Sequence, residues 1–195
     1  MTEGYLEIIL GGMYAGKTSR LIQIHTTYSY IGKKIMVINY AEDKRYHDSM
    51  VSAHDGKMIP CVMTLDIHDM WFNGNHEYYN LIHDAEVILI NEGQFFIQLY
   101  DTILSMVETA KKRVYICGLD GDFKRQKFGE LLDLVPHCDK VEKLTALCAI
   151  CRDGKKALFS KRVTNEEVQV VIGSDNYIPV CRMCYNYEKD FLQTI

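Results

Sequence analysis

A glycine-rich stretch near the N-terminus contains the residue types that bind the phosphates of a nucleoside triphosphate. It satisfies the pattern G-x-x-x-x-G-K-[ST] and consists of Gly11, Gly12, Met13, Tyr14, Ala15, Gly16, Lys17 and Thr18. In this pattern the glycines let successive backbone N–H groups face an anion, the lysine reaches the β- and γ-phosphates, and the hydroxyl lies on Mg²⁺. The stretch therefore predicts a site for a nucleoside triphosphate with Mg²⁺, and it does not identify the acceptor.

Charged residues that follow two apolar runs are further candidates for chemistry. Glu92 comes soon after the run 86–90, where a phosphate-binding protein of this kind places a metal-side or catalytic acid. Asp43 and Arg45 follow the run 34–39 and could face Mg²⁺ and the γ-phosphate, respectively. A carboxylate in solvent remains the alternative for Glu92, and a solvated charged loop remains an equal alternative for Asp43 and Arg45.

Four of the seven cysteines form two C-x-x-C pairs near the C-terminus. They are Cys148, Cys151, Cys181 and Cys184. Four thiolates in two such pairs match tetrahedral Zn²⁺ in a closed structural site, without an open position for catalysis. A redox-active dithiol or a chance pairing is the alternative, and a reducing compartment favours a metal over disulfides. Cys61, Cys117 and Cys138 lie in apolar surroundings and are expected to be buried thiols.

Alternating strands and helices must position these residues. The apolar run 5–10 predicts a buried strand before the glycine-rich stretch, and helical spacing predicts a helix over 19–31 after it. Further strands are expected at 34–39, 58–65, 86–90, 114–117 and 141–147, and further helices at 66–85, interrupted at Asn73 and Gly74, and at 96–112. Pro60 indicates an edge position for its strand, and 47–57 is expected to be a loop or a hairpin. The alternation predicts a parallel α/β sheet with its sites at the carboxyl ends of the strands.

The composition is that of one globular domain, with at most a small appendage. The chain has 195 residues, of which 48% are apolar and 25% charged. Its net charge of −4 disfavours a nucleic-acid coat or a membrane-surface protein, which normally has a basic face. No run approaches the ~18 apolar residues of a membrane helix, and the first strand begins too early for a signal peptide. We therefore expect a cytoplasmic protein that binds neither nucleic acid nor membranes.

Two segments in the second half of the chain have unusual composition. The strand-end loop 118–129 contains Phe123 and Phe128, which must pack on the core or on the ring of a ligand, because exposed phenylalanines are costly. Between the cysteine pairs, 157–160 and 168–172 resemble two strands joined by a loop that a metal pins at its base. A loop of this length is usually functional when it is held so firmly.

Together these parts resemble the type II thymidine kinases, the family of cytosolic cellular and large-DNA-virus enzymes, over almost the whole chain. Besides the glycine-rich stretch and the cysteine pairs, the resemblance rests on Asp43, Arg45 and Tyr46, on 92–96, on 119–123 with Phe128 and Gly129, and on Lys161 and Arg162. It implies an α/β fold with a P-loop, RecA-like, mostly parallel sheet flanked by helices over 1–147. A small zinc-bound lasso domain would follow over 148–195.

The resemblance also implies the reaction, which is ATP-dependent phosphorylation of thymidine to dTMP. Glu92 would be the general base for the thymidine 5′-hydroxyl, Lys17 would hold phosphates, and Arg45 would offset charge on the transferring phosphoryl group. The implied ATP and Mg²⁺ site comprises Gly11, Gly12, Met13, Tyr14, Ala15, Gly16, Lys17, Thr18, Asp43, Arg45, Asn91 and Gln94. Such a set supplies the positioning and electrostatic help that phosphoryl transfer needs.

On the acceptor side, the resemblance implies that Phe123 stacks on thymine while the lasso reads the base largely through its main chain. The implied thymidine site comprises Met13, Leu119, Phe123, Phe128, Ser160, Val168, Gln169, Val170, Val171, Ile172 and Tyr177. Zn²⁺ would be structural and would fix the ends of the lasso. The family pattern further implies a homotetramer with dTTP as feedback inhibitor.

The chain departs from the family pattern at three positions. Asn91 stands where the family usually has aspartate, so we expect Mg²⁺ binding to depend more on Asp43 and the phosphates. Gly12 stands where proline is common, which should loosen the loop slightly. Ser160 stands where a threonine often flanks the 5-methyl group of the base, which predicts a roomier pocket for larger 5-substituents.

Three alternative functions fit parts of the sequence. A nucleoside-monophosphate kinase with a zinc-held lid would have its cysteines in the middle of the chain, whereas here they lie near its end. A P-loop ATPase with a nucleic-acid-binding zinc ribbon predicts a basic groove, which the acidic balance does not favour. The intact Lys17, Thr18 and Glu92 disfavour a non-catalytic zinc-ribbon adaptor.

Overall fold

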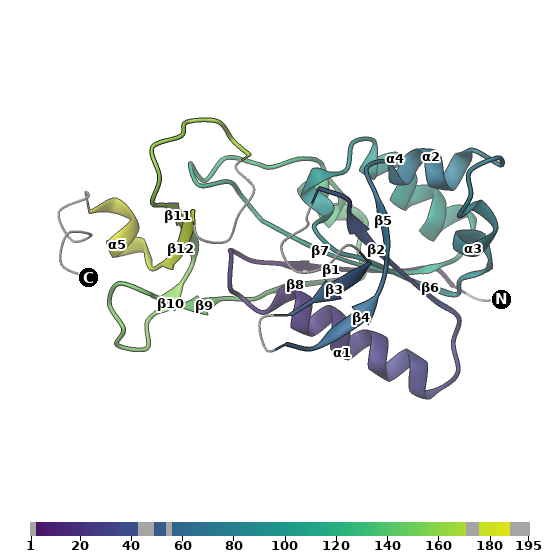
Figure 1. Ribbon diagram of the computed structural model, residues 1–195, viewed down its shortest axis with the longest axis horizontal. Helices are drawn as coiled ribbons and strands as arrows, with labels where there is room; N and C mark the ends of the chain where they lie inside the picture. Colours follow the sequence, from purple (N-terminus) through teal and green to yellow (C-terminus); the bar gives the residue numbers. More distant parts are fainter. Residues whose placement is uncertain (1–2, 43–48, 54–55, 171–175, 188–195) are drawn as a thin grey trace.

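The computed structural model describes residues 3–42, 49–53, 56–170 and 176–187. Six parallel strands form the central sheet in the order β5-β2-β6-β7-β1-β8 (Figure 1). Their bounds are β1 Tyr5–Leu10, β2 Ile35–Tyr40, β5 Val62–Thr64, β6 Val87–Ile90, β7 Arg113–Gly118 and β8 Lys140–Lys143. The prediction of a mostly parallel α/β sheet flanked by helices is confirmed. Of the predicted site residues, Asp43, Arg45, Val171 and Ile172 lie outside the described residues.

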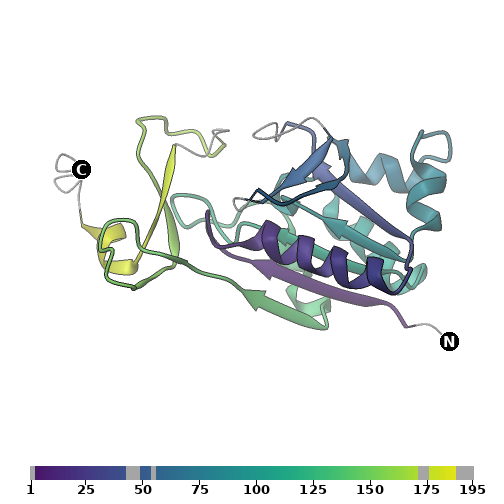
Figure 2. The ribbon, with the colours of Figure 1, turned by 60° about the horizontal axis from the view of Figure 1, so that its bottom comes forward.

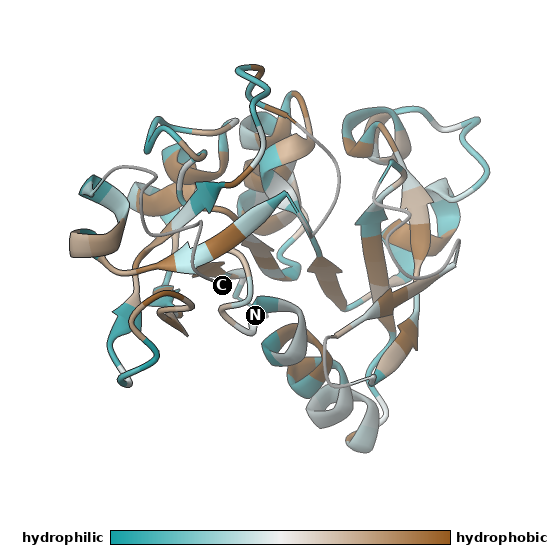
Figure 3. Cartoon of the chain, turned by 60° about the vertical axis from the view of Figure 1, so that its left-hand side comes forward, coloured by the Kyte–Doolittle hydropathy of each residue, from teal (hydrophilic) through white to brown (hydrophobic). Residues whose placement is uncertain are grey.

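Helices cover both faces of the sheet (Figures 1 and 2). The elements concerned are α1 Lys17–Tyr30 on one face, and α2 Ile67–Phe72, α3 Tyr79–Asp84 and α4 Leu99–Leu104 on the other. Alternate residues of each strand serve alternate cores, so that Leu6 and Ile8 pack with α2 to α4 whereas Ile9 packs with α1. The hydrophobic colour in Figure 3 accordingly concentrates on the strands, and hydrophilic residues predominate in the outer loops.

The predicted helices form with different ends. The segment 66–85 is divided near Asn73 as expected, into α2 and α3. The helix predicted over 96–112 begins only at Leu99 and continues beyond α4 as a π-helical turn, Ser105–Thr109. Short 3-10 helices at Gly93–Phe95 and Leu131–His137 complete this side of the sheet.

The strand predicted over 58–65 is two strands. Its first part, β4 Met58–Pro60, pairs with β3 Met50–Ser52 in a hairpin beside the sheet, whereas β5 is the edge strand next to β2. Because Pro60 has no backbone N–H, the ladder breaks there. The N–H of Cys61 then donates to the Ser49 carbonyl, and the chain turns into the sheet.

The strand predicted over 141–147 was also too long. The N–H of Leu144 donates to the Leu10 carbonyl at 2.8 Å, and beyond that bond β1 has ended in the glycine-rich loop. With no strand left to pair with, the chain leaves the sheet. Its next residues, β9 Ala146–Leu147, pair with β10 Lys156–Ala157 in a separate C-terminal unit.

The C-terminal unit is built on two short antiparallel pairs and one helix. Besides β9 and β10 it contains β11 Phe159–Arg162, β12 Tyr177–Val180 and α5 Arg182–Asn186. The expected strand over 168–172 is wrong for 168–170, which is irregular. The carbonyls of Val168 and Gln169 accept hydrogen bonds from Arg162 instead of from a neighbouring strand.

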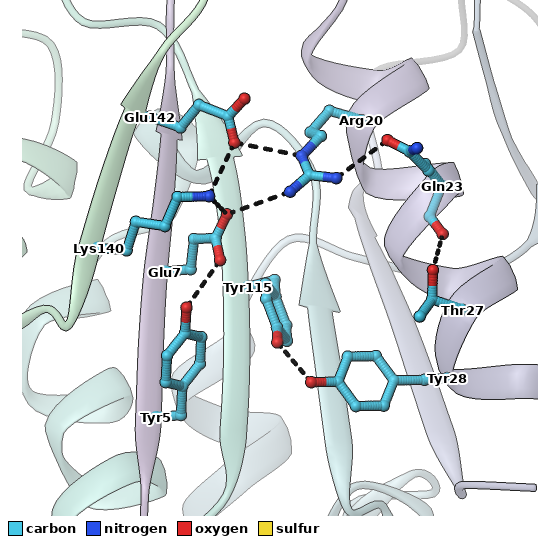
Figure 4. A network of polar contacts seen from close by, with 9 residues as sticks. All are labelled: Tyr5, Glu7, Arg20, Gln23, Thr27, Tyr28, Tyr115, Lys140 and Glu142. Carbon is cyan, nitrogen blue, oxygen red and sulfur yellow. Dashed lines mark hydrogen bonds and ion pairs between the residues drawn. The ribbon is translucent and has the colours of Figure 1, made fainter. Parts of the chain in front are cut away.

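A charged network fastens the edge strand β8 and helix α1 to β1 (Figure 4). The buried carboxylate of Glu7 accepts from Lys140 Nζ at 2.9 Å and from the Tyr5 hydroxyl at 2.8 Å, and it lies 3.8 Å from Arg20 Nη2. The Glu142 carboxylate forms ion pairs with Arg20 and Lys140, both at 3.2 Å. The network thus fixes β8 and α1 to β1, which leads into the glycine-rich loop.

Among the described residues, no helix combines the length and apolarity needed to cross a membrane.

Candidate functional site

The glycine-rich stretch lies between β1 and α1, in the order that phosphate binding at a helix N-terminus requires. Gly11 allows the loop to pass the C-terminal end of β8, because a Cβ there would lie 2.5 Å from the Leu144 carbonyl oxygen. Tyr14 adopts the left-handed conformation (φ 62°). The buried Lys17 donates from Nζ to the Gly12 carbonyl at 2.9 Å. The backbone of the glycine-rich loop thus fixes the position of the Lys17 ammonium group.

Glu92 is a second point of backbone strain, directly beyond β6. It adopts the left-handed conformation (φ 55°, ψ 42°) and its side chain is buried. Such strain in a residue without a glycine's freedom is typical of functional sites. Its Oε2 accepts from Gln94 Nε2 at 2.7 Å, and Gln94 Oε1 accepts in turn from the Leu119 N–H at 3.0 Å. Gln94, predicted as part of the ATP site, therefore orients the Glu92 carboxylate from behind.

Asn91 belongs to a buried polar cluster. Its Nδ2 donates to Asn39 Oδ1 at 2.8 Å, and its Oδ1 accepts from Cys117 Sγ at 3.0 Å and from Thr18 Oγ1 at 3.5 Å. Burial, with the nearby Glu92 charge, raises the pKa of the Cys117 thiol to about 12, so the thiol keeps its proton and donates. Both the amide nitrogen and the amide oxygen of Asn91 thus have hydrogen-bond partners.

A large pocket opens above these groups, at the carboxyl ends of the strands. The space within it, including open solvent, is about 1230 Å³. Predicted site residues that line it are Met13, Tyr14, Ala15, Gly16, Lys17, Thr18, Asn91, Glu92, Leu119, Phe123, Phe128, Ser160, Gln169, Val170 and Tyr177. The structure thereby brings the donor-side and acceptor-side predictions into one cavity. Gly11, Gly12, Gln94 and Val168 were predicted for the site but do not line this pocket.

Other lining residues escaped sequence reasoning. They include Asn39, Tyr40, Met50, Val51, Ser52, Phe95 and Asp122. Phe95 stacks on Tyr40 with ring centroids 4.9 Å apart and meets Phe128 edge-on at 5.2 Å. Asn39 could have been predicted as a site residue, because it is a polar residue near the end of an apolar strand. No sequence pattern indicated that the hairpin β3–β4 lines the pocket.

The loop 119–128 closes one side of the pocket around a buried carboxylate. Asp122 Oδ1 accepts from the N–H groups of Lys124 and Gln126, both at 2.8 Å. Its Oδ2 accepts from Gln169 Nε2 at 2.8 Å, which joins this loop to the segment between the cysteine pairs. Phe123 and Phe128 both line the pocket, and Phe128 also packs on Phe95, so packing within the protein is present for Phe128.

The C-terminal unit contacts the glycine-rich loop directly. Ser160 Oγ on β11 accepts from the Met13 N–H at 2.9 Å. A Cβ on Gly12 would lie 3.1 Å from the same oxygen, tighter than an ordinary contact. Glycine at position 12 thus lets the loop pass close to Ser160.

The four predicted cysteine ligands come together in one cluster. All their sulfur atoms lie within 4.8 Å of one another, and Cys151 Sγ is 3.3 Å from Cys184 Sγ and 3.7 Å from Cys181 Sγ. Four sulfurs arranged tetrahedrally at the Zn–S distance are about 3.8 Å apart. Burial raises the pKa of the Cys184 thiol, whereas at Cys148 burial is outweighed by the N–H groups of Cys151, Cys181 and Ile150, which lower the pKa to about 6. The cluster can therefore bind a metal ion, and its donor set fits zinc.

Comparison with known proteins assigns the family. The sequence profile of the family described as "Thymidine kinase" matches residues 4–185. The chain belongs to the thymidine kinase family. The resemblance predicted from the motifs and the prediction of a kinase are thereby confirmed.

Relatives in this family come from viruses, plants and animals. The thymidine kinase of Yaba monkey tumor virus is 37% identical over 183 residues, which cover 93% of this chain and 94% of the relative. The thymidine kinase of Oryza sativa subsp. japonica is 37% identical over 184 residues, or 93% of this chain and 66% of the relative. The "Thymidine kinase, cytosolic" of Bos taurus is 36% identical over 188 residues, or 94% and 73%. Membership in this family favours a thymidine kinase over the three alternatives.

Proposed function

We propose that this thymidine kinase transfers the γ-phosphoryl group of ATP to the 5′-hydroxyl of thymidine, giving dTMP and ADP, with Glu92 as the general base. The observation that carries the proposal is the position of the Glu92 carboxylate. It lies buried in the pocket between the glycine-rich loop and the loop 119–128, and Gln94 orients it. A base so placed takes the proton of a hydroxyl that enters from the acceptor side.

On the donor side, Lys17 and the loop N–H groups hold the phosphates of ATP. Thr18 and Asp43 would hold Mg²⁺, which shields phosphate charge when bound. Asn91 supports Thr18 from behind, because its oxygen already accepts from Thr18 and Cys117. Arg45 offsets charge on the transferring group. With this assignment, we still expect Mg²⁺ binding to depend less on residue 91 in this chain than it does where the family has its usual aspartate.

On the acceptor side, thymine occupies the apolar part of the pocket. Phe123 stacks on the base, while Phe128, Leu119 and Met13 close around it. The lining residues Gln169 and Val170 belong to the lasso, which reads the base through its main chain, with Val168, Val171 and Ile172 as further members. Support comes from the lining of the pocket, where Tyr177 and Ser160 flank the same space.

The remaining parts of the proposal concern the whole molecule. We place the boundary between the kinase domain and the lasso domain at 147 and 148, close to where the chain leaves the sheet for the C-terminal unit. The cysteine cluster binds structural Zn²⁺. The protein is a cytoplasmic homotetramer inhibited by dTTP, and a relative named cytosolic supports that location. Native mass spectrometry tests the tetramer, and kinase assays with added dTTP test the inhibition.

The decisive experiment is ATP-dependent phosphorylation of thymidine, with dTMP as the competing acceptor. Glu92→Gln keeps the size and polarity of the side chain but cannot accept a proton, so turnover should fall by more than ~10²-fold. Glu108→Gln, an exposed carboxylate on the π-helical turn, is the matched control and should retain turnover. Turnover of dTMP but not of thymidine, or an active Glu92→Gln variant, would contradict the proposal.

A further inference from the structure

We infer that Arg162 is the positioning residue for the acceptor, because it fixes the main chain of the segment 166–170. This inference rests on the proposed function, in which that segment reads the base. Arg162 is the last residue of β11 and only 9% of its surface is exposed. A buried guanidinium requires partners for its donors. The two terminal nitrogens of Arg162 have them, whereas Nε has none among the described residues, and the partners of the terminal nitrogens reveal the role of the side chain.

The partners are backbone carbonyls of one irregular segment. Nη1 donates to the carbonyl oxygens of Glu166 at 2.8 Å and Val168 at 2.5 Å, and Nη2 donates to that of Gln169 at 3.1 Å. The segment 166–170 belongs to no strand, so these carbonyls lack the ladder bonds that a sheet would give them. One side chain thus supplies the hydrogen bonds that secondary structure supplies elsewhere.

The same guanidinium also reaches the residues proposed to bind the base. Its central carbon lies 3.7 Å from the centroid of the Phe123 ring, and Nη2 contacts the Tyr177 hydroxyl. A cation this close to a ring is attracted by its electron-rich face. Arg162 therefore joins the segment 166–170, β12 and the loop 119–128. It packs against the Phe123 ring, on which the base is proposed to stack.

The role requires arginine and not merely positive charge. The planar fork presents several N–H donors in fixed directions, whereas lysine has one ammonium group on a flexible stem. Arg162→Lys therefore keeps the charge but cannot hold three carbonyls and cover Phe123 together. The Gln169–Asp122 hydrogen bond remains in this variant, so the segment stays attached to the loop 119–128 at one point.

The test is steady-state kinetics of the full chain, loaded with zinc, varying thymidine and ATP separately. For Arg162→Lys we expect the thymidine KM to rise at least ~10-fold, and the ATP KM to change less than ~3-fold. The matched control is Arg182→Lys, since Arg182 lies on α5, is exposed, and has its guanidinium 5.1 Å from the Phe159 ring. The control should leave both KM values near those of the wild type.

A second readout separates positioning from general loss of structure. Amide hydrogen exchange of 163–170 should accelerate in Arg162→Lys without substrate, while the strands of the central sheet keep their protection. If Arg162→Lys does not fold, Tyr177→Phe removes one partner of the fork and should raise the thymidine KM by a smaller factor. Equal increases in both KM values, or unchanged exchange in 163–170, would overturn the inference. A wild type that does not phosphorylate thymidine would refute the proposed function instead.

Discussion

The exchange Asn91→Asp tests how the polar cluster at the end of β6 is built. The side-chain amide of Asn91 donates to Asn39 Oδ1 at 2.8 Å, and both residues are buried. Aspartate has no N–H, so the exchange places two acceptor oxygens against each other. An unsatisfied buried acceptor costs ~1–3 kcal/mol. We therefore expect the free energy of unfolding of the ligand-free protein to fall by ~1–3 kcal/mol, measured by urea denaturation.

The new carboxylate has the opposite effect once the donor substrate is present. It lies beside Thr18, whose hydroxyl is proposed to bind Mg²⁺. An anionic oxygen there attracts the cation, so half-maximal turnover should require less Mg²⁺, and added Mg²⁺ and ATP should restore part of the lost stability. Turnover measured over a series of Mg²⁺ concentrations gives the first quantity, and denaturation with the ligands gives the second.

Asn75→Asp is the control, because it makes the same chemical change at an exposed position between α2 and α3. It should alter stability by less than ~0.5 kcal/mol. A ligand-free Asn91→Asp variant as stable as the wild type would refute the assigned amide donor. An unchanged Mg²⁺ dependence would refute the hypothesis that the asparagine shifts Mg²⁺ binding toward Asp43 and the phosphates.

Four further predictions concern the pocket, the cysteine cluster and the network around Glu7. Ser160→Thr adds a methyl group, and the KM for thymidine analogues with bulky 5-substituents should rise ~10-fold relative to thymidine; equal KM changes for both would contradict this. Chelation of the Zn²⁺ proposed for the cysteine cluster should expose four reactive thiols and raise the thymidine KM more than the ATP KM; thiols equally reactive before chelation would contradict it. Glu7→Gln should lower the free energy of unfolding by ~1–3 kcal/mol, less than for a fully buried pair because its cationic partners are partly exposed; Glu108→Gln serves as control. Burial and the bond to Glu7 raise the pKa of Tyr5 to about 12, so stability should fall above pH ~10, where the unfolded chain loses this proton first; Tyr5→Phe should weaken that fall in denaturation series.

The parts of the fold that local sequence determines were predictable. The strand Tyr5–Leu10, the loop after it and the following helix agree with the expectation, because apolar runs, glycines and helical spacing act over a few residues. The position of Glu92 at a strand end followed from the same pattern. The clustering of the cysteines was also predictable, since two C-x-x-C pairs together match the four ligands of one Zn²⁺ site.

The errors arose where a partner distant in sequence decides the structure. An apolar pattern cannot show which strands are neighbours, so the strand predicted over 141–147 ran past the end of its neighbour β1. The segment 168–170 has the composition of a strand, but Arg162 takes the bonds of its carbonyls. Gln94, predicted for the ATP site, contacts Glu92 and Leu119, and this pairing was not foreseen from the sequence.

The hydrogen bond from the Met13 N–H to Ser160 Oγ joins residues that lie 147 positions apart. During synthesis, the ribosome delivers the glycine-rich loop long before it delivers this hydroxyl. The nascent sheet can assemble from β1 to β8, yet the glycine-rich loop still lacks this partner until β11 has been made. Completion of the glycine-rich loop is thus coupled to the folding of the C-terminal unit, and the proposed Zn²⁺ would make metal supply a condition for a finished loop far away in the sequence.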